Sequence, residues 1–385
     1  MDILEIGYPF IPVPPASGYG PTEAVISCVS EEMVQQGHRV ALWAPDGSST
    51  TADFFSSGAP ASLQVTPQQW RTLRDGSSLG AYRLAYERGV GLIHDHTEFT
   101  EYDVPIGRPR IPVVRTIHKP ASMPGAVEAF QAMSRAGDAF VAISARQRDL
   151  FHAAAARSGG GTINIVGVVH NPIDLMGIPF SQEKHNTALF LGRCDLAKAP
   201  DSAIRVARAA GMHLVLALKV VEYEQDERNR RYYHETVKPL IEQGLADGTI
   251  TLLGEISQQR KLELLAQAGA VLFTSGGPVG ADNEWEEPFG LVLTEAMAAG
   301  APVLAFNKGS APEVIAQGVT GWVCDTEDEM ADALRHAHTL DPHTCRAHVQ
   351  RHFSPAAATA GYLAVFEHVL ATTPSEVAMP LRMAD

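Results

Sequence analysis

The sequence predicts an α/β protein with parallel sheets, built as two domains. Short apolar runs alternate along the chain with longer amphipathic segments, which is typical of strands and helices that follow one another in βαβ units. At 385 residues the chain is long enough for two domains of ordinary size. The pattern breaks near residues 170–174, where His-Asn-Pro-Ile-Asp precedes a polar stretch and a new apolar run. We therefore expect one α/β domain on each side of a hinge at this break.

The predicted elements follow from the spacing of apolar residues. Short apolar runs indicate buried strands, and longer segments with apolar residues at helical spacing indicate helices. In the first half we expect strands near residues 2–7, 39–44, 91–94, 112–116, 139–143 and 164–169, and helices near 22–36, 67–88, 125–135 and 145–155. In the second half we expect strands near 187–191, 213–218, 250–253, 270–273 and 302–305, and helices near 200–210, 228–245, 257–268, 290–299, 326–337 and 356–371.

The composition limits the classes of partner. The formal net charge of −14 opposes nucleic acid or a strongly anionic membrane surface as the main partner. No apolar run reaches the length of a membrane span, and the first residues lack the basic segment and apolar core of a signal peptide. The 4 cysteines are far apart and form no Cys-x-x-Cys pair, which indicates neither a zinc site nor a disulfide framework. We expect a cytoplasmic protein.

The stretch at residues 284–300 combines carboxylates with the start of a helix. Glu287 lies at the predicted helix entrance, and Glu295 follows about two turns later, roughly 12 Å away by helical rise. The two carboxylates of a glycosidase lie closer, at about 5 to 9.5 Å, so the spacing better suits one elongated ligand held at two places. The helix N-terminus between them offers amides to an anion. A helix cap followed by a solvated glutamate remains the alternative.

A second polar patch follows the strand predicted at 187–191. Arg193 and Lys198 stand after a glycine turn and just before a predicted helix. Arginine can bind a phosphate group with two hydrogen bonds, and lysine adds a mobile charge. Cations are the wrong charge for a helix N-terminus unless an anion joins them, which favours a phosphate site over two solvated cations.

The residues around Glu287 and Glu295 also match a family signature. Glu287-Pro-Phe-Gly-Leu-Val-Leu-Thr-Glu295, followed by Ala-Met-Ala-Ala-Gly-Ala-Pro-Val, resembles the signature of the retaining glycosyltransferases of family 4. The resemblance, dense over residues 187–323, implies the GT-B fold, in which two Rossmann-like domains face each other across a cleft. It implies that Glu287 lies beside the donor sugar and that Glu295 holds the nucleotide ribose. The backbone of Phe289, Gly290 and Leu291 would face the sugar and the diphosphate.

The same resemblance extends to other segments of the second half. Arg193 and Lys198 correspond to the cations that bind the donor diphosphate, although Ala199 replaces the usual glycine. The run Thr-Leu-Leu-Gly-Glu-Ile ending at Ile256 is similar to a turn whose backbone reads the nucleotide base.

In the first half the resemblance is thinner. Gly20 belongs to a run, Tyr-Gly-Pro-Thr-Glu, that is similar to the family's glycine-rich first loop near the diphosphate and the acceptor. Pro21 replaces a glycine there and removes one amide donor. His118 ends a predicted strand within a Thr-x-His run that, in the family, reaches the donor sugar or its phosphate. A partly buried structural histidine is the alternative for His118.

Two further features of the first half are interpreted structurally. His94 and His96 form a His-x-His pair that could bind a metal. Such histidines more often hydrogen-bond locally at a strand end, and similar ones in the family carry no metal, so we expect no metal site. Ser144 follows a predicted strand and is expected to be a helix N-cap.

The resemblance implies the following organisation and function. We expect an acceptor-side domain at 1–174, a nucleotide-sugar domain at 175–355, and a C-terminal helix and tail at 356–385 that cross back to the first domain. The expected activity is transfer of a hexosyl group, with retention, from a nucleotide-diphospho-sugar, most simply a UDP-sugar, to an unknown acceptor. No cofactor is expected. A GT-B nucleotide-sugar epimerase and a non-catalytic sugar-nucleotide binding protein are the alternatives.

Overall fold

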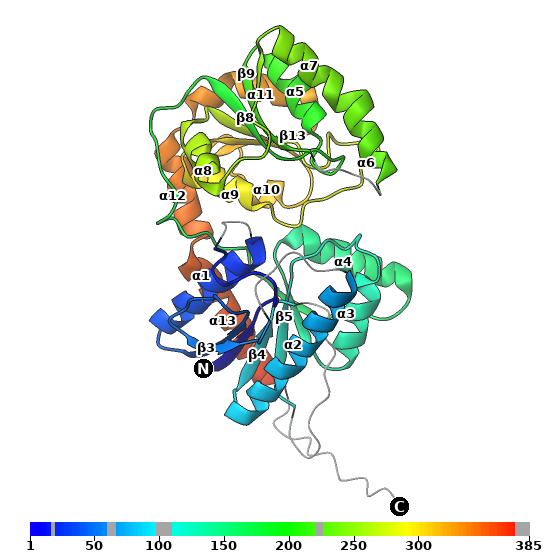
Figure 1. The fold of residues 1–385 in the computed structure, drawn as a ribbon, viewed down its shortest axis with the longest axis vertical. Helices are drawn as coiled ribbons and strands as arrows, with labels where there is room; N and C mark the ends of the chain where they lie inside the picture. Colours follow the sequence, from blue (N-terminus) through cyan, green and yellow to red (C-terminus); the bar gives the residue numbers. More distant parts are fainter. Residues whose placement is uncertain (17–19, 60–66, 98–109, 221–225, 374–385) are drawn as a thin grey trace, which may run out of the picture. The chain divides into compact units, whose positions relative to one another are not determined.

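The computed structural model describes residues 1–16, 20–59, 67–97, 110–220 and 226–373 (Figure 1). The chain divides into two compact units. The first unit comprises Met1–Pro172 with Pro355–Asp385, and the second comprises Ile173–Ser354. The elements of each unit are therefore considered separately.

The first unit is built on a parallel sheet. Over its described residues the strand order is β3-β2-β1-β4-β5-β6-β7, and every neighbouring pair is parallel. The strands are β1 (Asp2–Ile6), β2 (Arg39–Ala44), β3 (Asp53–Ser56), β4 (Leu92–Asp95), β5 (Val113–Ile117), β6 (Ala139–Ala142) and β7 (Ile165–Val168).

Helices cover both faces of this sheet because its side chains alternate between two apolar cores. Ile3 packs in a core with residues of α1 and α13, whereas the next residue, Leu4, packs in a core with residues of α2. A third core joins β6 to α3 and α4. The helices are α1 (Pro21–Gln35), α2 (Pro67–Arg88), α3 (Ala126–Arg135), α4 (Ala145–Ser158) and α13 (Pro355–Thr372).

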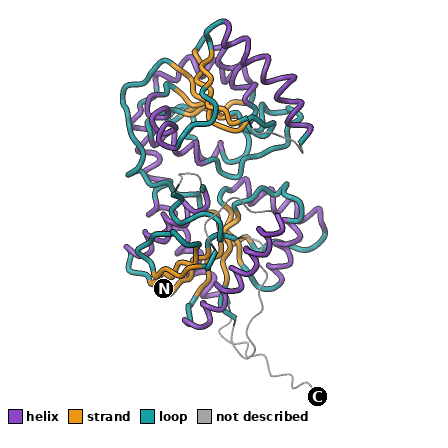
Figure 2. The backbone as a smooth tube through the Cα atoms, viewed as in Figure 1, coloured by secondary structure: helices purple, strands orange, loops and turns teal. Residues whose placement is uncertain are grey.

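The second unit repeats this architecture with a shorter sheet. Its strand order is β10-β9-β8-β11-β12-β13, again parallel throughout the described residues. The strands are β8 (Thr187–Arg193), β9 (His213–Lys219), β10 (Ile250–Leu252), β11 (Ala270–Phe273), β12 (Val303–Phe306) and β13 (Gly321–Cys324). Figure 2 shows the strands of each unit enclosed by helices.

The helices of the second unit also lie on both faces. One apolar core joins the sheet to α5, α7 and α11, and α5 lies beside α11 (Figure 1). On the other side α9 packs against α8 and α12. The helices are α5 (Pro200–Ala210), α6 (Glu227–Tyr232), α7 (Lys238–Ala246), α8 (Gln258–Gln267), α9 (Leu291–Ala298), α10 (Ala311–Val314), α11 (Glu327–His336) and α12 (Pro342–His352), with a π-helical turn at Tyr233–Val237 and a 3₁₀ turn at Ala337–Thr339.

Each sheet has a point where its strand order reverses. In the second unit the chain runs outward from β8 through β9 to β10, then returns to the other side of β8 with β11. The loops after β8 and β11 therefore leave the carboxyl edge of the sheet in opposite directions. Open α/β sheets bind ligands in the crevice that such a reversal creates. The corresponding point in the first unit lies between β1 and β4.

The structure contains elements that the sequence analysis did not predict, namely β3, β13, α10 and α12. The edge strand β3 is largely exposed, so it shows neither an apolar run nor a clean alternation. In α12 only Cys345 and Val349 are buried, which leaves little helical periodicity. Its start did carry a signal, because Asp341 caps the helix and Pro342 is its first residue. The predicted N-cap at Ser144 is confirmed, since its Oγ accepts a hydrogen bond from the Gln147 amide at 3.1 Å.

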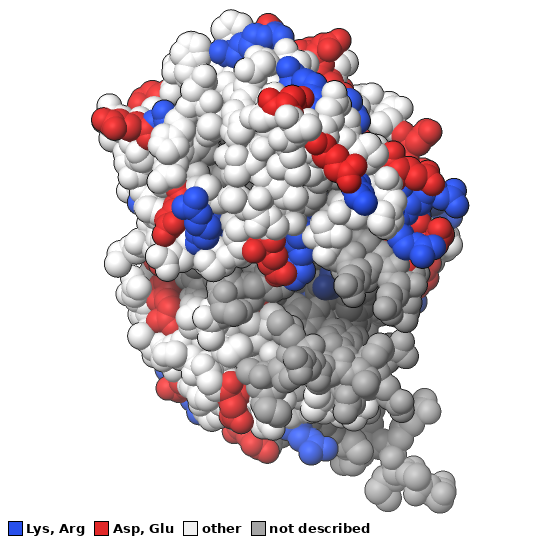
Figure 3. All heavy atoms as spheres, turned by 45° about the horizontal axis from the view of Figure 1, so that its top comes forward, with Lys and Arg blue, Asp and Glu red and all other residues white. Residues whose placement is uncertain are grey.

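The surface agrees with the charge balance of the sequence. On the face shown in Figure 3, acidic and basic side chains are interspersed and do not gather into a basic patch. Within the described residues, no helix has both the length and the apolar character needed to cross a membrane.

Candidate active site

Glu287 lies in the loop between β11 and α9, and its carboxylate is the point where several side chains meet. Its Oε2 lies 2.5 Å from Lys198 Nζ. Trp285 Nε1 and Ser275 Oγ reach the same oxygen at 3.1 and 3.2 Å. In the part of the chain that the structure describes, none of these bonds goes to Oε1. The arrangement fixes the carboxylate through one oxygen and leaves the other for a ligand.

The backbone around Glu287 is shaped by a proline and a glycine. Pro288 lacks an amide proton, and Gly290 takes a left-handed φ of 79° as the N-cap of α9. The helix therefore begins at Leu291, only one turn before Glu295. Our spacing of two helical turns between the glutamates was thus wrong, because residues 287–290 are not helical. Gly290 gives α9 no side-chain cap, so the first amides of α9 are suited to an anionic ligand.

Lys198 is held by a tight turn after β8. Its amide donates to the backbone carbonyl of Asp195 at 3.1 Å and to the Asp195 carboxylate at 2.9 Å. The next residue, Ala199, has a φ of 46°, the left-handed region where glycine is favoured. The same position carries a glycine in the family that the motif resembles. Thr274 Oγ1 lies 3.0 and 2.8 Å from the Lys198 and Ala199 carbonyls, which ties this turn to the end of β11.

Arg193 ends β8, in register with Lys219 at the end of β9. Its Nε lies 3.0 Å from Asp195 Oδ2, and its side chain is half exposed. Lys219 pairs with Glu255 at 2.6 Å, and both side chains are at least half exposed. Cys194, which lies between Arg193 and Asp195, is fully buried.

Glu295 faces a different partner from Glu287. Its Oε1 lies 2.6 Å from Lys261 Nζ, and both side chains are mostly buried. Lys261 lies on α8, one turn after the Ser257 N-cap, and Ile256, directly before that cap, is half-buried. The side of the sheet with α8 and α9 thus carries Glu295 and Ile256, while the loops after β8 and β11 carry Lys198 and Glu287. The ring of Phe289 is buried against Phe353, so only its backbone is available to a ligand.

The loop at residues 275–283, between β11 and α9, is anchored at both ends. The Gly276 amide donates to Ala197 O at 2.8 Å, and Asn283 Nδ2 reaches Leu196 O at 2.5 Å. Lys308 Nζ donates to the Gly276 and Asn283 carbonyls at 2.7 and 2.8 Å. These bonds hold the loop against the turn that carries Lys198.

The charge state of Glu287 follows from its neighbours. Burial by itself raises the pKa of the carboxyl group, but the Lys198 ammonium and the bonds from Lys198, Trp285 and Ser275 outweigh it, so the pKa lies below its usual value. Glu287 is therefore an anion at neutral pH. Since the folded state lowers this pKa, the carboxylate stabilises the fold above its unfolded pKa, and that contribution is lost as the pH falls through the folded value.

The first unit holds the remaining predicted residues. Gly20 immediately precedes α1, and Glu23 in its first turn is buried, which raises the pKa of this carboxyl group to about 7. Gly18 and Tyr19 of the glycine-rich loop lie outside the described residues. His118 follows β5 and is half-buried. His94 and His96 are fully buried and hydrogen-bonded to Glu5.

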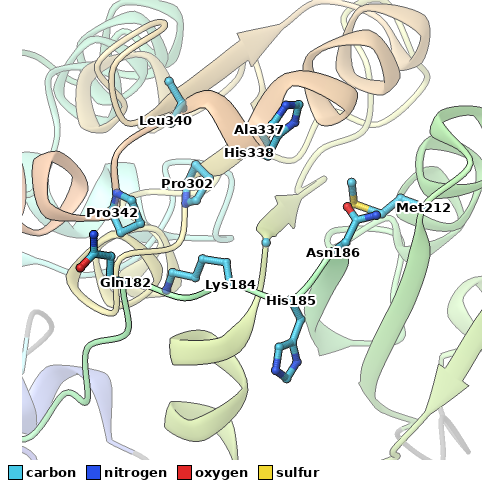
Figure 4. A pocket seen from close by; sticks show the side chains of 11 residues that line it. Gln182, Lys184, His185, Asn186, Met212, Pro302, Ala337, His338, Leu340 and Pro342 are labelled. Carbon is cyan, nitrogen blue, oxygen red and sulfur yellow. The ribbon is translucent and has the colours of Figure 1, made fainter.

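A separate pocket of about 510 Å³ lies away from these residues (Figure 4). Asn186, Met212, Gly269 and Pro302 in its lining each directly precede a strand of the second sheet. The pocket therefore lies at the amino edge of the sheet, opposite the carboxyl edge where Lys198 and Glu287 meet. We do not assign it to the candidate active site.

The sequence analysis missed the residues that position the two glutamates. Ser275 and Trp285 bind Glu287, and Lys261 binds Glu295. Trp285 lies within the stretch at residues 284–300, just before the family motif, but its indole N–H could not be assigned to a partner from sequence. Lys261 is one of many polar residues on its helix, and no local signal singles it out.

The backbone of Gly309 lies close to the backbone of Glu287, and a substitution at Gly309 tests this contact. Gly309 has a φ of +57°, and a Cβ there would lie 2.5 Å from the Glu287 carbonyl oxygen. Gly309→Ala is expected to destabilise the fold and to weaken ligand binding, because the Glu287 backbone must move. Gly318→Ala is the control: its φ is +69°, and a Cβ there meets nothing within 4 Å. The control should cost about 1–2 kcal/mol for the left-handed backbone alone. Equal losses of unfolding free energy and ligand affinity in the two variants, measured by denaturation and titration, would contradict this role.

The chain matches two family models that together cover both units. Residues 22–177 match the model of Glycosyltransferase Family 4, and residues 174–349 match the model of Glycosyl transferases group 1. The fold and the site thus define a GT-B type protein, as predicted. The chain belongs to the group 1 glycosyltransferases of family 4.

Individual relatives agree with this assignment. The N-acetyl-alpha-D-glucosaminyl L-malate synthase of Bacillus anthracis is 36% identical over 93 residues, which are 24% of this chain and 22% of that protein. The chain thus aligns with about a fifth of that relative's length. AviGT4, a glycosyltransferase involved in Avilamycin A biosynthesis, superposes with a TM-score of 0.68 at 22% identity, over 97% of this chain and 99% of its own. HepE of Anabaena in complex with UDP-glucose gives 0.61 at 17% identity, over 95% and 99%. These likenesses confirm the predicted fold of two Rossmann-like domains.

Proposed function

We propose that this chain is a retaining glycosyltransferase that moves a hexosyl group from a nucleotide-diphospho-sugar to an acceptor. The observation that carries the proposal is the pair of Lys198 and Glu287, with 2.5 Å between Nζ and Oε2, at the reversal point of the second sheet. It combines a cation suited to a diphosphate with a carboxylate suited to a sugar. We favour a UDP-sugar as the donor, supported by the UDP-glucose complex of HepE.

The diphosphate is assigned to Arg193, Lys198 and the start of α9. Arg193 is the last residue of β8 and Lys198 lies in the turn that follows it, and Gly290 opens α9 without a side-chain cap. A doubly charged diphosphate matches these groups better than a neutral ligand would, because helix amides and guanidinium groups bind phosphate oxygens strongly. Since Lys198 is already paired with Glu287, the diphosphate would share an ammonium group whose position is fixed.

The sugar is assigned to Glu287 and the ribose to Glu295. Lys198, Trp285 and Ser275 hold Oε2 of Glu287, so Oε1 would accept bonds from sugar hydroxyls. Lys261 holds Oε1 of Glu295, which leaves Oε2 for the ribose hydroxyls. The nucleotide base is then assigned to the backbone at Ile256, in the loop before the helix that carries Lys261.

In the proposed reaction the acceptor hydroxyl attacks the anomeric carbon on the face from which the diphosphate leaves. The bond from this carbon to the phosphate oxygen breaks, the bond to the acceptor oxygen forms, and the acceptor proton passes to the leaving phosphate oxygen. Arg193 and Lys198 stabilise the negative charge on the diphosphate, so no divalent metal would be needed. Glu287 stabilises the positive charge on the sugar, and His118 is assigned to the donor sugar or its phosphate. A covalent glycosyl–Glu287 intermediate is the alternative route.

The two glutamates are expected to fail in different ways. Glu295→Gln should weaken UDP binding, because it is assigned to the ribose that UDP carries. Glu287→Gln should mainly lower kcat, because its carboxylate is assigned to the sugar, which UDP lacks. Calorimetric titration with UDP and initial rates with the UDP-sugar separate the two effects. Equal losses of UDP affinity in both variants, with equal turnover, would refute this division.

A donor screen tests the proposed function. We would incubate the protein with nucleotide sugars and EDTA, first alone and then with candidate acceptors, and follow the anomeric protons by NMR. The proposal predicts transfer to an acceptor with the donor's anomeric configuration retained. Conversion of the donor sugar without an acceptor would indicate an epimerase, and UDP-sugar binding without turnover would indicate a binding protein. Loss of activity in EDTA that Mg²⁺ or Mn²⁺ restores would contradict the metal-independent route.

The proposed location is the cytoplasm. Cys28, Cys194, Cys324 and Cys345 form no disulfide within the described residues, which fits a reducing compartment. Burial raises the pKa of the Cys194, Cys324 and Cys345 thiols to about 12, so these side chains are neutral and unreactive.

A further inference from the structure

In the first unit, hydrogen bonds connect His118 to a cluster of buried side chains. Glu5 on β1, His94 on β4 and His96 just after β4 are fully buried, and His118 follows the neighbouring strand β5. Glu5 Oε2 lies 3.2 Å from His96 Nε2, and His96 Nδ1 lies 3.0 Å from His118 Nε2. On its other side Glu5 Oε1 lies 3.0 Å from His94 Nδ1. Each of these three contacts joins two ring nitrogens or a ring nitrogen and a carboxylate oxygen.

The proton positions in this cluster follow from the carboxylate. Burial raises the pKa of Glu5, but its interactions with His94 and His96 outweigh burial and lower it to about 2. Glu5 is therefore ionised and can only accept hydrogen bonds. Consequently His96 Nε2 carries a proton that it donates to Glu5.

The same reasoning passes from His96 to His118. Burial lowers the pKa of His96, so its ring is neutral and has only one N–H. With that proton on Nε2, Nδ1 of His96 is an acceptor, and the contact at 3.0 Å requires a proton on His118 Nε2. Burial also lowers the pKa of His118 well below its usual value, so this ring is neutral too.

We infer that Glu5 and His96 are positioning residues that hold His118 as the neutral Nε2–H tautomer, with Nδ1 as a hydrogen-bond acceptor. This inference deepens the proposed function, on which the role of His118 at the donor rests. His118 would then accept a hydrogen bond from a sugar hydroxyl and would not donate one to a phosphate oxygen. It narrows the assignment of His118 from the donor sugar or its phosphate to the sugar hydroxyls.

The cluster has one competing explanation, a metal site. One ligand atom each from Glu5, His94 and His96 lies within 4.8 Å of the others, and carboxylate with histidine is a donor set that zinc accepts. A metal bound at the His96 nitrogen that faces Glu5 would move the ring proton to Nδ1. His96 would then donate to His118 Nε2, and His118 would carry its proton on Nδ1. The two explanations thus predict opposite tautomers of His118.

The experiment records long-range ¹H–¹⁵N correlations of the histidine rings in the full chain labelled with ¹⁵N-histidine. A His118→Asn variant identifies the His118 signals by their absence. We expect a protonated Nε2 and an unprotonated Nδ1 on His118, with no zinc in the protein by elemental analysis. A protonated Nδ1 on His118, or stoichiometric zinc, would overturn the inference. This readout needs no substrate, so it stands or fails separately from the glycosyltransferase assignment.

Two variants test the link from Glu5. Glu5→Gln offers one acceptor oxygen to two histidines that each donate to the carboxylate, so His118 should lose its single tautomer and show signals of both. Tyr362→Phe is the matched control: it removes one buried hydroxyl 3.2 Å from Thr116 Oγ1, which itself lies 2.8 Å from His94 Nε2, the side away from His118. The control should leave the His118 signals unchanged. An unchanged His118 tautomer in Glu5→Gln, or an equal change in the control, would show that Glu5 does not set the tautomer of His118. If Glu5→Gln does not fold, the wild-type spectrum still decides which tautomer His118 adopts.

Discussion

Replacing Lys198 by alanine is expected to weaken UDP binding by roughly ten- to one-hundred-fold, as the loss of a charge-assisted bond of about 1.5–3 kcal/mol implies. Turnover should fall further, by about a hundred-fold, because the same ammonium stabilises charge that develops as the diphosphate leaves. The substitution also removes the cation that lowers the pKa of Glu287. That carboxylate would then stand beside the diphosphate without its counter-ion. Titration with UDP and steady-state rates with the UDP-sugar give both quantities.

The control for Lys198 is a cation of the same unit that lies away from the proposed site. Arg208 is in the last turn of α5, whereas Lys198 precedes the first turn. Arg208 pairs with Asp247 on the surface at 3.3 Å. Arg208→Ala should leave UDP affinity and turnover unchanged. Arg193→Ala should resemble Lys198→Ala in UDP affinity. Unchanged UDP affinity in both Arg193→Ala and Lys198→Ala would remove the phosphate assignment.

The largest loss of stability is expected from Arg115→Met in the first unit. Arg115 on β5 is 1% exposed and lies between two buried carboxylates, 2.6 Å from Asp95 and 2.7 Å from Asp138. Its Nη2 also donates to the Tyr82 hydroxyl at 3.1 Å. Methionine fills similar space but leaves both carboxylates buried without this counter-ion. Removing one partner of a buried ion pair costs about 3–5 kcal/mol, so chemical denaturation should show a loss of at least that size.

An exposed ion pair of the same unit is the comparison for Arg115. Arg39 pairs with Asp2 at 2.5 Å, but its side chain is 82% exposed. Arg39→Met should change the unfolding free energy by only about 0–1 kcal/mol. If Arg115→Met lowered the unfolding free energy as little as Arg39→Met, the buried ion pairs of Arg115 would not stabilise the fold as their short distances indicate.

The donor-side residues could be predicted because their chemistry is local in the sequence. Glu287 and Glu295 stand in one run of residues, and Arg193 and Lys198 stand in another. Their hydrogen-bond partners could not be predicted. Ser275 and Lys261 come from other segments of the chain, and only the folded arrangement of β11, α8 and α9 brings them to the two glutamates. Ala199 shows the same limit, since its left-handed φ follows from the turn that holds Lys198.

The fold could be predicted from the sequence where the strands are buried, and the prediction failed for largely exposed elements. Strand β11 was predicted at its observed residues because all of them are buried and apolar. The exposed edge strand β3 and the polar helix α12 carry too few buried residues to show a period. The buried Arg115 network was also invisible, because its carboxylates come from β4 and from the residue before β6. Its charges looked like ordinary surface residues until the sheet placed them together.

The central claim is that the carboxyl edge of the second sheet binds the donor diphosphate. A crystal structure of the protein with UDP, grown in the presence of EDTA, tests it most directly. The account predicts diphosphate oxygens at hydrogen-bond distance, about 2.7–3.2 Å, from Arg193 and Lys198, and the ribose at Glu295. UDP bound without contact to Lys198, or seated in the pocket lined by Lys184 and Pro302 at the opposite edge, would contradict it.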